Sequence, residues 1–234
     1  MYFKKTPMET KAVSDVSLKL NKAELTALMG RTGSGKTTLA NLAAGLLEPT
    51  DGAVMVDSLH TGKKRNSLSI SQKVGLVFQY PEAQFFCPTV AEEIEFALKN
   101  FAIDNPNRQL TLQALSKVGL TESYMNRNPF RLSGGEQRLV AIASNIVWDP
   151  DYLFFDEPTA GLDARSRRHV LSVIKKLEET GKGVYIITHD ISLVKKEAKR
   201  LIVLCKGSLY YEGSVKTFFN NPKDMEEAGI IVPF

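Results

Sequence analysis

Short apolar runs and amphipathic stretches alternate along most of the chain. Because parallel strands are buried on both faces and are joined by helices, this alternation is typical of a layered α/β fold. Continuous apolar runs predict buried strands over residues 25–29, 74–78, 152–155, 184–187 and 201–204. Helical periodicity predicts helices over residues 37–47, 164–180 and 191–199.

The remaining pattern predicts smaller pieces of structure. Residues 13–20 alternate between apolar and polar, as a half-exposed strand does. The run 53–56 is strand-like, whereas residues 58–72 are polar and predict no clear element. A hairpin-like turn at 206–208 leads into a further strand at 209–211.

A helix-rich stretch interrupts this alternation. Thr89 and Glu92 have the spacing of a capping box ahead of an amphipathic stretch. Further helical patterns lie near residues 107–118 and 135–147. We therefore expect a single domain over residues 1–234, with a helical subdomain of roughly residues 80–147 inserted into a parallel α/β core.

Composition excludes several classes of protein. With 43% hydrophobic and 24% charged residues, the chain is neither disordered, collagen-like nor a coiled coil. No apolar run approaches the ~18–20 residues of a transmembrane helix, and the N-terminus does not have the pattern of a signal peptide. Cys87 and Cys205 lie far apart in sequence, which fits a reducing cytoplasm. A net charge of +4 is too small to argue for nucleic acid by itself.

A phosphate-binding pattern follows the first predicted buried strand. The segment Gly30-Arg31-Thr32-Gly33-Ser34-Gly35-Lys36-Thr37 matches G-x-x-x-x-G-K-[ST]. Its glycines let backbone N–H groups wrap a phosphate, and the helix N-terminus adds a favourable dipole. Lys36 would reach the β- and γ-phosphates, and the Thr37 hydroxyl would coordinate Mg²⁺. The position between a strand and a helix favours a P-loop over a chance match.

Two more segments have chemistry that depends on this P-loop. Asp156 and Glu157 end a predicted strand, where an Asp can hold Mg²⁺ and a Glu can accept a proton from water. Alone, the pair would fit a solvated turn better. Ser133 could cap the helix that follows it, and Gly134 and Gly135 would leave N–H groups open to an anion. Taken locally, a simple capped helix is the preferred interpretation.

Together these motifs carry a family resemblance over nearly the whole chain. The segment Leu132-Ser133-Gly134-Gly135-Glu136-Gln137-Arg138, between a P-loop and a strand-end Asp-Glu, strongly resembles the ABC transporter ATPases. Gln79 lies where the family has its Q-loop, Gly161-Leu162-Asp163 looks like the D-loop, and His189 looks like the switch histidine. The resemblance implies a P-loop NTPase of the ABC ATPase type, with a parallel sheet core, a helical subdomain and a small antiparallel β part.

One segment narrows the resemblance further. The segment Val77-Phe78-Gln79-Tyr80-Pro81-Glu82-Ala83-Gln84-Phe85-Phe86 looks like the Q-loop of energy-coupling factor (ECF) transporter ATPases, which include the cobalt-importer type. Residues 30–35 and 128–133 are similar to that group as well. ECF systems import vitamins or transition-metal ions through a membrane substrate-binding subunit and a shared transmembrane coupling subunit. The resemblance thus implies the ATP-hydrolysing subunit of such an importer, peripheral on the cytoplasmic face of the cell membrane.

In this family two ATPase subunits, identical or similar, face head to tail, and each ATP lies between one P-loop and the partner's signature sequence. The resemblance implies that ATP is contacted by Arg31, Thr32, Gly33, Ser34, Gly35, Lys36, Thr37, Thr38, Ser133, Gly134, Gly135 and Asp163. Thr37, Gln79 and Asp156 would hold Mg²⁺. Glu157 would be the general base, Gln79 would sense Mg²⁺ and water, and His189 would stabilise the transferring phosphoryl group.

The resemblance also implies a groove around residues 79–101 that receives helices of the coupling subunit. Glu82, Glu92, Glu93 and Glu95 make this segment acidic, which would complement arginines of that subunit. Glu92 has the alternative of a capping residue, and Glu93 and Glu95 that of a solvated helix face. For Phe85 and Phe86 the alternative is packing in the core. A solvated helix face is expected for Arg165, Arg167 and Arg168.

The chain departs from the family pattern near its start. Tyr2 looks like the aromatic residue that stacks on adenine, yet only Met1 precedes it, so we expect the family's first strand to be missing. A frayed terminus would hold the Tyr2 ring poorly. At the other end, many ECF ATPases continue beyond the position of Phe234 into a short dimerisation segment.

Other functions remain open at this point. A conventional ABC importer or a lipoprotein exporter would use the same chemistry with another membrane partner. An ABC ATPase acting on nucleic acid would carry coiled coils, tandem cassettes or strongly basic arms, and the sequence has none, so we expect no nucleic-acid partner. A P-loop small-molecule kinase would lack the Leu-Ser-Gly-Gly sequence. The cargo itself is not encoded in this chain, because ECF specificity resides in another polypeptide.

Overall fold

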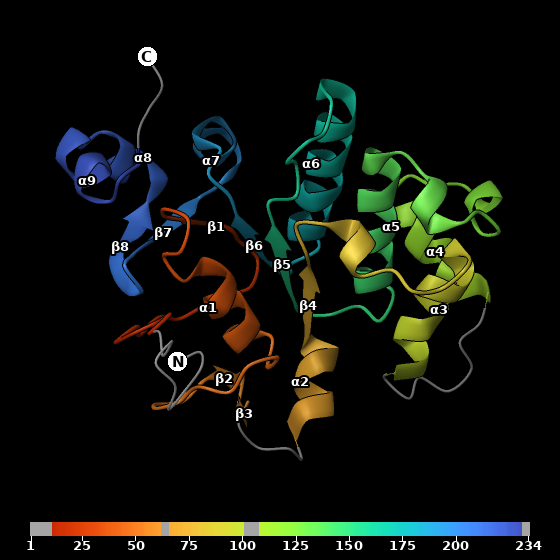
Figure 1. Cartoon of the computed structure of the whole chain (residues 1–234), viewed down its shortest axis with the longest axis horizontal. Coiled ribbons are helices and arrows are strands. Elements are labelled where there is room, and N and C mark those ends of the chain that lie inside the picture. Colours follow the sequence, from red (N-terminus) through yellow and green to blue (C-terminus); the bar gives the residue numbers. More distant parts are fainter. Residues whose placement is uncertain (1–10, 62–65, 101–107, 231–234) are drawn as a thin grey trace.

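A twisted, mostly parallel sheet forms the centre of the computed structural model, which describes residues 11–61, 66–100 and 108–230 (Figure 1). Its strand order is β4-β5-β6-β1-β7-β8. The parallel strands are β1 (Leu25–Met29), β4 (Val74–Val77), β5 (Tyr152–Asp156), β6 (Gly183–Ile187) and β7 (Arg200–Cys205). All five lie within one or two residues of the ranges that the apolar runs predict. The last strand, β8 (Ser208–Ser214), pairs antiparallel with β7 through the predicted hairpin.

Helices cover both faces of this sheet, as the double burial of its strands requires. Leu153 and Phe155 of β5 belong to the core beneath α5 (Gly134–Ile146) and α6 (Ala164–Glu179). Phe154 points to the opposite face and packs in the core with α1 (Lys36–Ala43) and α2 (Ser67–Lys73). Successive residues of one strand therefore serve two cores. A third core joins β1 and β7 to α7 (Ile191–Glu197) and α8 (Val215–Phe219).

The helix-rich stretch forms three α-helices that pack on one another. They are α3 (Val90–Asn100), α4 (Arg108–Lys117) and α5, with short 3₁₀ turns at Pro81–Ala83, Glu122–Tyr124 and Pro129–Arg131. Their apolar faces share the core of α6 and the sheet. Figure 1 shows this group of helices beside the β4 edge of the sheet.

Several local predictions differ from the structure. Residues 13–20 are not a strand: Val16, Leu18 and Leu20 are half-buried against the core, but this segment forms no ladder in the part of the chain described. Alternation sets which side chains turn inward, whereas a strand also needs a paired neighbour. Residues 58–72, for which no element is predicted, contain β3 (Leu59–His60) and most of α2. β3 pairs antiparallel with β2 (Met55–Val56) and forms the small antiparallel part.

Two helix ends also differ from the pattern. Helix α1 ends at Ala43 rather than at residue 47, because Gly45 takes a left-handed conformation (φ +71°) and its N–H bonds to the Leu42 carbonyl. Helices α8 and α9 (Pro222–Glu227) follow β8, where no helix is predicted. Among the described residues, no helix is both long enough and apolar enough to span a membrane.

Candidate functional site

The site lies at the carboxyl ends of the parallel strands, where loops from β1, β5 and β6 meet. Strand pairing aligns Asp156 of β5 with Ile187 of β6, and Leu28 of β1 with the same Ile187. Residues that directly follow these three strands therefore lie side by side. This is the edge at which open α/β sheets bind their ligands.

The loop after β1 has the backbone of a phosphate cradle. Gly30, Gly33 and Gly35 all have positive φ. A Cβ at Gly30 would lie 2.2 Å from the Leu204 carbonyl oxygen, and one at Gly35 would lie 2.3 Å from the Ala12 carbonyl oxygen. Only glycine fits these positions. No side chain caps helix α1, so its first N–H groups point into the loop without a side-chain acceptor.

Two side chains of this loop fit an anionic ligand. The Lys36 ammonium group folds back and donates to the carbonyl oxygens of Gly30 (2.8 Å) and Arg31 (2.9 Å). Burial lowers the pKa of Lys36, although Glu157 and Asp156 oppose that shift. The Ser34 hydroxyl is buried and has no hydrogen-bond partner among the described residues. A bound phosphate would provide acceptors for both groups.

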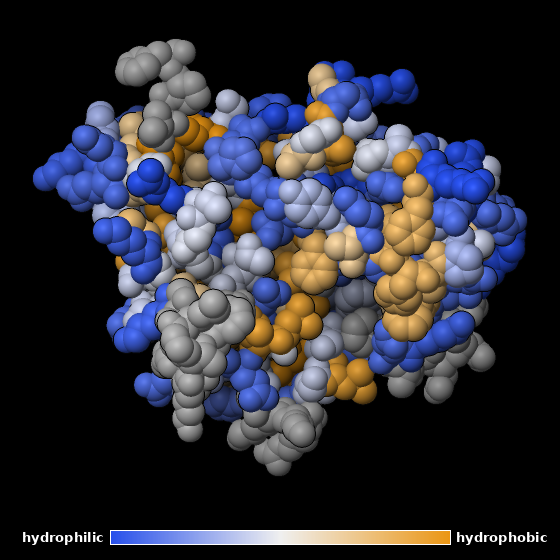
Figure 2. Space-filling model, viewed as in Figure 1, coloured by the Kyte–Doolittle hydropathy of each residue, from blue (hydrophilic) through white to orange (hydrophobic). Residues whose placement is uncertain are grey.

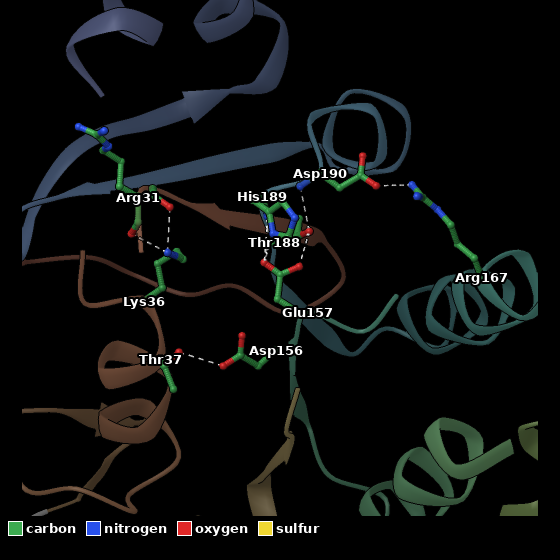
Figure 3. A network of polar contacts seen from close by, with 10 residues as sticks. Arg31, Lys36, Thr37, Asp156, Glu157, Arg167, Thr188, His189 and Asp190 are labelled. Carbon is green, nitrogen blue, oxygen red and sulfur yellow. Dashed lines mark hydrogen bonds and ion pairs between the residues drawn. The ribbon is translucent and has the colours of Figure 1, made fainter. Parts of the chain in front are cut away.

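The first residue pair of the site joins helix α1 to β5. The Thr37 hydroxyl donates to Oδ2 of Asp156 at 2.9 Å (Figure 3). Asp156 is buried, and burial raises the pKa of its carboxyl group. A hydroxyl and a carboxylate oxygen side by side are a hard donor pair of the type that Mg²⁺ prefers. A magnesium ion here would offset the unfavourable burial of the carboxylate.

Glu157 and the loop after β6 form the second part of the site. One oxygen of the Glu157 carboxylate accepts from the backbone N–H of His189 (3.0 Å) and lies 2.7 Å from its ring Nδ1. The other oxygen accepts from the Thr188 hydroxyl at 3.1 Å. Glu157 also has a left-handed backbone (φ +45°), which is uncommon for this residue type and directs its side chain across the sheet edge.

The signature segment begins helix α5 with the predicted Ser133 cap, which Glu136 extends to a full capping box. Ser133 Oγ accepts from the Glu136 N–H, and Glu136 accepts from the Ser133 N–H at 2.8 Å. The Tyr124 hydroxyl donates to the same carboxylate at 2.6 Å, and this bond together with Ser133 lowers the pKa of Glu136. Ser133 and Gly134 are exposed, so this helix start is open to a ligand or a partner.

A buried arginine joins the signature helix to the Q-loop. The Arg138 guanidinium, only 3% exposed, donates to the carbonyl oxygens of Phe78 (2.8 Å) and Gln79 (2.6 Å). Gln84 holds the same segment through its side-chain amide. The amide donates to the Leu76 carbonyl and accepts from the Phe78 N–H, and so provides partners for backbone groups at the free edge of β4. The sequence predicts a role for Gln79, whereas the contact from Arg138 that holds its backbone has no signal in the sequence.

The D-loop residue Asp163 caps helix α6. Its carboxylate accepts from the N–H groups of Arg165 and Ser166 and from the Ser166 hydroxyl, and the bond to Ser166 lowers its pKa. One turn later, Arg167 pairs with Asp190 of the loop after β6. The Arg167 side chain is 37% exposed, so it stays partly solvated, as expected, and in addition has a charged partner.

The segment after the Q-loop presents an aromatic surface. Phe86 and Phe96 are 59% and 39% exposed and contact each other edge to face, with ring centroids 4.4 Å apart. Apolar side chains gather on the helical part of the molecule in Figure 2. Glu93 is buried rather than solvated, because its carboxylate accepts from the N–H groups of Phe86 (3.0 Å) and Cys87 (2.9 Å). We call Phe86 and Phe96 the aromatic ledge; Phe85 by contrast is a core residue.

Other predicted site residues take simple positions. Thr32 is exposed in the P-loop and Thr38 is half-buried in α1. The side-chain stem of Arg31 lies against Gly229, where a Cβ would come within 2.4 Å of its Cδ. Half of the capping box expected at Thr89 and Glu92 is present: the backbone N–H of Glu92 donates to Thr89 Oγ1 at 3.3 Å. Tyr2 lies outside the described residues.

The comparisons with known proteins agree with this geometry. The family model described as ABC transporter matches residues 13–160. The energy-coupling factor transporter ATP-binding protein EcfA2 of Thermotoga maritima is 43% identical over 93% of this chain and 81% of its own length, and that of Clostridium tetani is 40% identical over 100% and 82%.

Solved structures show the same fold. The ATP-binding cassette MJ0796, a dimer in a post-hydrolysis state bound to ADP and Pi, matches with a TM-score of 0.81 and 31% identity over 90% of this chain and 94% of that one. The protein cbiO1 from Clostridium perfringens, part of the ABC transporter complex cbiONQ, matches with a TM-score of 0.79 and 27% identity over 95% and 89%. The predicted fold class is confirmed.

Proposed function

This chain belongs to the ABC transporter family as one of its ATP-binding ATPases, and we propose that it is the ATP-hydrolysing subunit of an ECF-type importer of a vitamin or transition-metal ion. One observation carries the proposal. The P-loop, the Thr37–Asp156 pair and the Glu157–His189 pair meet at one sheet edge, next to a Q-loop segment that continues into the aromatic ledge. Relatives about 40% identical over the whole chain are ATP-binding proteins of energy-coupling factor transporters.

In this proposal the triphosphate lies in the cradle of residues 30–35. Lys36 leaves the Gly30 and Arg31 carbonyls and donates to the β- and γ-phosphates instead. Thr37, Asp156 and Gln79 would hold Mg²⁺, which would neutralise charge on the phosphate oxygens. The buried position of Asp156 and the unpartnered Ser34 hydroxyl both support an occupant of this kind.

The second half of each ATP site comes from another ATPase subunit. Ser133 and Gly134 are exposed at the start of helix α5, and we assign them, with the buried Gly135 beside them, to a γ-phosphate presented by a partner. Asp163 begins the neighbouring helix α6, and a Cβ on Gly135 would lie 2.6 Å from Ser166 Oγ. The signature and D-loop therefore form one surface, which we assign to the interface of a head-to-tail dimer.

Hydrolysis then proceeds by attack of water on the γ-phosphorus. Glu157 accepts one proton of the water, whose oxygen bonds to phosphorus while the bond to the β–γ bridging oxygen breaks. ADP leaves with the bridging electron pair, together with phosphate. In the described arrangement the Glu157 carboxylate is held by His189 and Thr188, and we infer that His189 turns toward the γ-phosphate and frees one of its oxygens for water. The switch histidine thus links nucleotide binding to release of the base.

We assign the aromatic ledge to the transmembrane coupling subunit, which would hold this chain on the cytoplasmic face of the membrane. Glu82 and Glu92 are exposed beside the ledge and give it negative charge, which complements a basic helix. Glu93 is excluded from direct contact, because its carboxylate fixes the ledge backbone from inside.

A pull-down of the tagged chain from detergent-solubilised membranes of its source tests the proposal. A coupling subunit together with a small substrate-binding membrane protein is expected, and both are expected to be lost with Phe86→Asp. The matched control is Leu46→Asp, since Leu46 is equally exposed (58%) but lies outside the ledge. Recovery of a conventional ABC permease would contradict the ECF assignment and leave the ATPase assignment intact.

A further inference from the structure

The loop that holds Glu157 is itself fixed by an ion pair between Asp190 at its end and Arg167 of helix α6. Within the described part of the chain, this switch loop, Thr188 to Asp190, makes the three polar contacts to the Glu157 carboxylate. Asp190 anchors its far end: Oδ1 accepts from the Leu193 N–H at the start of α7, and Oδ2 accepts from Arg167 of α6. Figure 3 shows Arg167 reaching across from its helix to Asp190, on the side opposite the P-loop.

We propose that Arg167 is a positioning residue for ATP hydrolysis, because its ion pair with Asp190 fixes the switch loop that orients Glu157 and His189. Among the described residues, the side-chain partner of Arg167 is Asp190, not Glu157 or the P-loop. Arg167 acts through a continuous chain of contacts: Arg167 to Asp190, the Asp190 N–H to the Thr188 hydroxyl (3.1 Å), and that hydroxyl to Glu157 (3.1 Å).

The environment of this ion pair favours positioning over stability. The two side chains are 37% and 23% exposed, so the pair contributes little to the free energy of folding. The guanidinium–carboxylate bond nevertheless has a defined geometry, which restricts where Asp190 can lie. Thr188, at the other end of the chain of contacts, is buried (1% exposed), so a shift of Asp190 is passed on to Glu157 rather than lost in solvent.

The position of Arg167 on its helix gives the ion pair a second consequence. Arg167 lies one helical turn after Asp163, the D-loop residue that caps α6. A displacement of the α6 start therefore moves the switch loop as well. This part rests on the proposed dimer, in which the D-loop meets the partner subunit; the positioning of Glu157 does not depend on it.

Steady-state ATPase measurements on five variants, four single and one double, test the inference. We expect Arg167→Met to lower kcat about tenfold, with the KM for ATP within about twofold and the Tm within a few degrees of wild type. Arg167→Lys, which keeps the charge, restores much of the loss. Arg168→Met is the matched control, since Arg168 is the exposed neighbour on the same helix, and it is expected to keep the wild-type kcat.

A double variant distinguishes the ion pair from other effects. Asp190→Asn removes the charge but retains a side chain that can cap α7. Combined with Arg167→Met it is expected to lower kcat no further than Arg167→Met alone, because both changes remove one interaction. A wild-type kcat in Arg167→Met, an effect on KM alone, or additive losses in the double variant would overturn the inference. A wild-type chain without ATPase activity would instead contradict the function itself.

Discussion

His189 binds Glu157 twice, through its backbone N–H and through its ring, with Nδ1 2.7 Å from a carboxylate oxygen. The His189 side chain is 81% exposed and that of Glu157 only 13% exposed, so the ring covers the carboxylate from the solvent side. A general base needs a free lone pair directed at water. On the proposal that Glu157 is the general base, we expect the histidine ring to move away from the carboxylate before hydrolysis.

Replacing the base tests this interpretation first. We expect Glu157→Gln to bind ATP with near-normal affinity and to lose turnover by about 10²–10⁴-fold, because the amide cannot accept the proton of the attacking water. Fluorescent-nucleotide titration and phosphate release measure the two quantities separately. Near-normal turnover in the variant would remove Glu157 from this role.

The Thr37–Asp156 pair predicts a loss confined to the magnesium-bound nucleotide. Asp156→Asn keeps the bond to Thr37 possible but removes the charge, so ATP affinity is expected to fall in Mg²⁺ and to change little in excess EDTA. Asp149→Asn is a control, since the side chain of Asp149 is 73% exposed and pairs with Lys182 away from this site. Equal losses with and without Mg²⁺ would contradict an ion at Asp156.

Arg138 predicts a loss of stability that extends to the Q-loop. Arg138→Met leaves the Phe78 and Gln79 carbonyls without their donors in a buried setting, at a cost of about 1–3 kcal/mol in the free energy of unfolding. Urea unfolding measures this cost, and hydrogen exchange at residues 78–84 is expected to rise. Arg131→Met, at an exposed position, serves as the control. Unchanged exchange in that segment would show that Arg138 does not hold it.

The capping box of the signature helix predicts a pH dependence of stability. Hydrogen bonds from Tyr124 and Ser133 lower the pKa of Glu136 below its usual 4.5, so the charged form is favoured in the folded state. The stabilisation is present above the unfolded pKa and is lost as the pH falls through the folded one. The difference in the free energy of unfolding between wild type and Glu136→Gln is therefore expected to shrink below about pH 4.5, as measured by urea unfolding at several pH values. A difference that is constant with pH would contradict this.

The sequence predicts best those parts of the site whose residues are adjacent in the chain. The P-loop and the strand-end pair Asp156–Glu157 carry their chemistry in consecutive residues, and the apolar runs position them. The role of Arg138 cannot be predicted in this way, because its partners are backbone carbonyls 59 and 60 residues away and any residue type can supply a carbonyl. The spacing of Glu93 likewise predicts an exposed helix face, whereas tertiary packing buries its carboxylate against two N–H donors.

The central claim is that two copies of this chain, or this chain and a similar one, share each ATP between the Lys36 of one subunit and the Ser133 of the other. Mixing two inactive homodimers tests it most directly. Lys36→Ala removes the P-loop lysine and Ser133→Arg blocks the signature, so a mixed head-to-tail dimer contains one doubly damaged site and one intact site. We predict that each variant alone is inactive and that the mixture regains up to about a quarter of the wild-type ATPase rate if the sites act independently. Where the wild-type chain alone hydrolyses ATP, a mixture as inactive as its components would contradict the shared site.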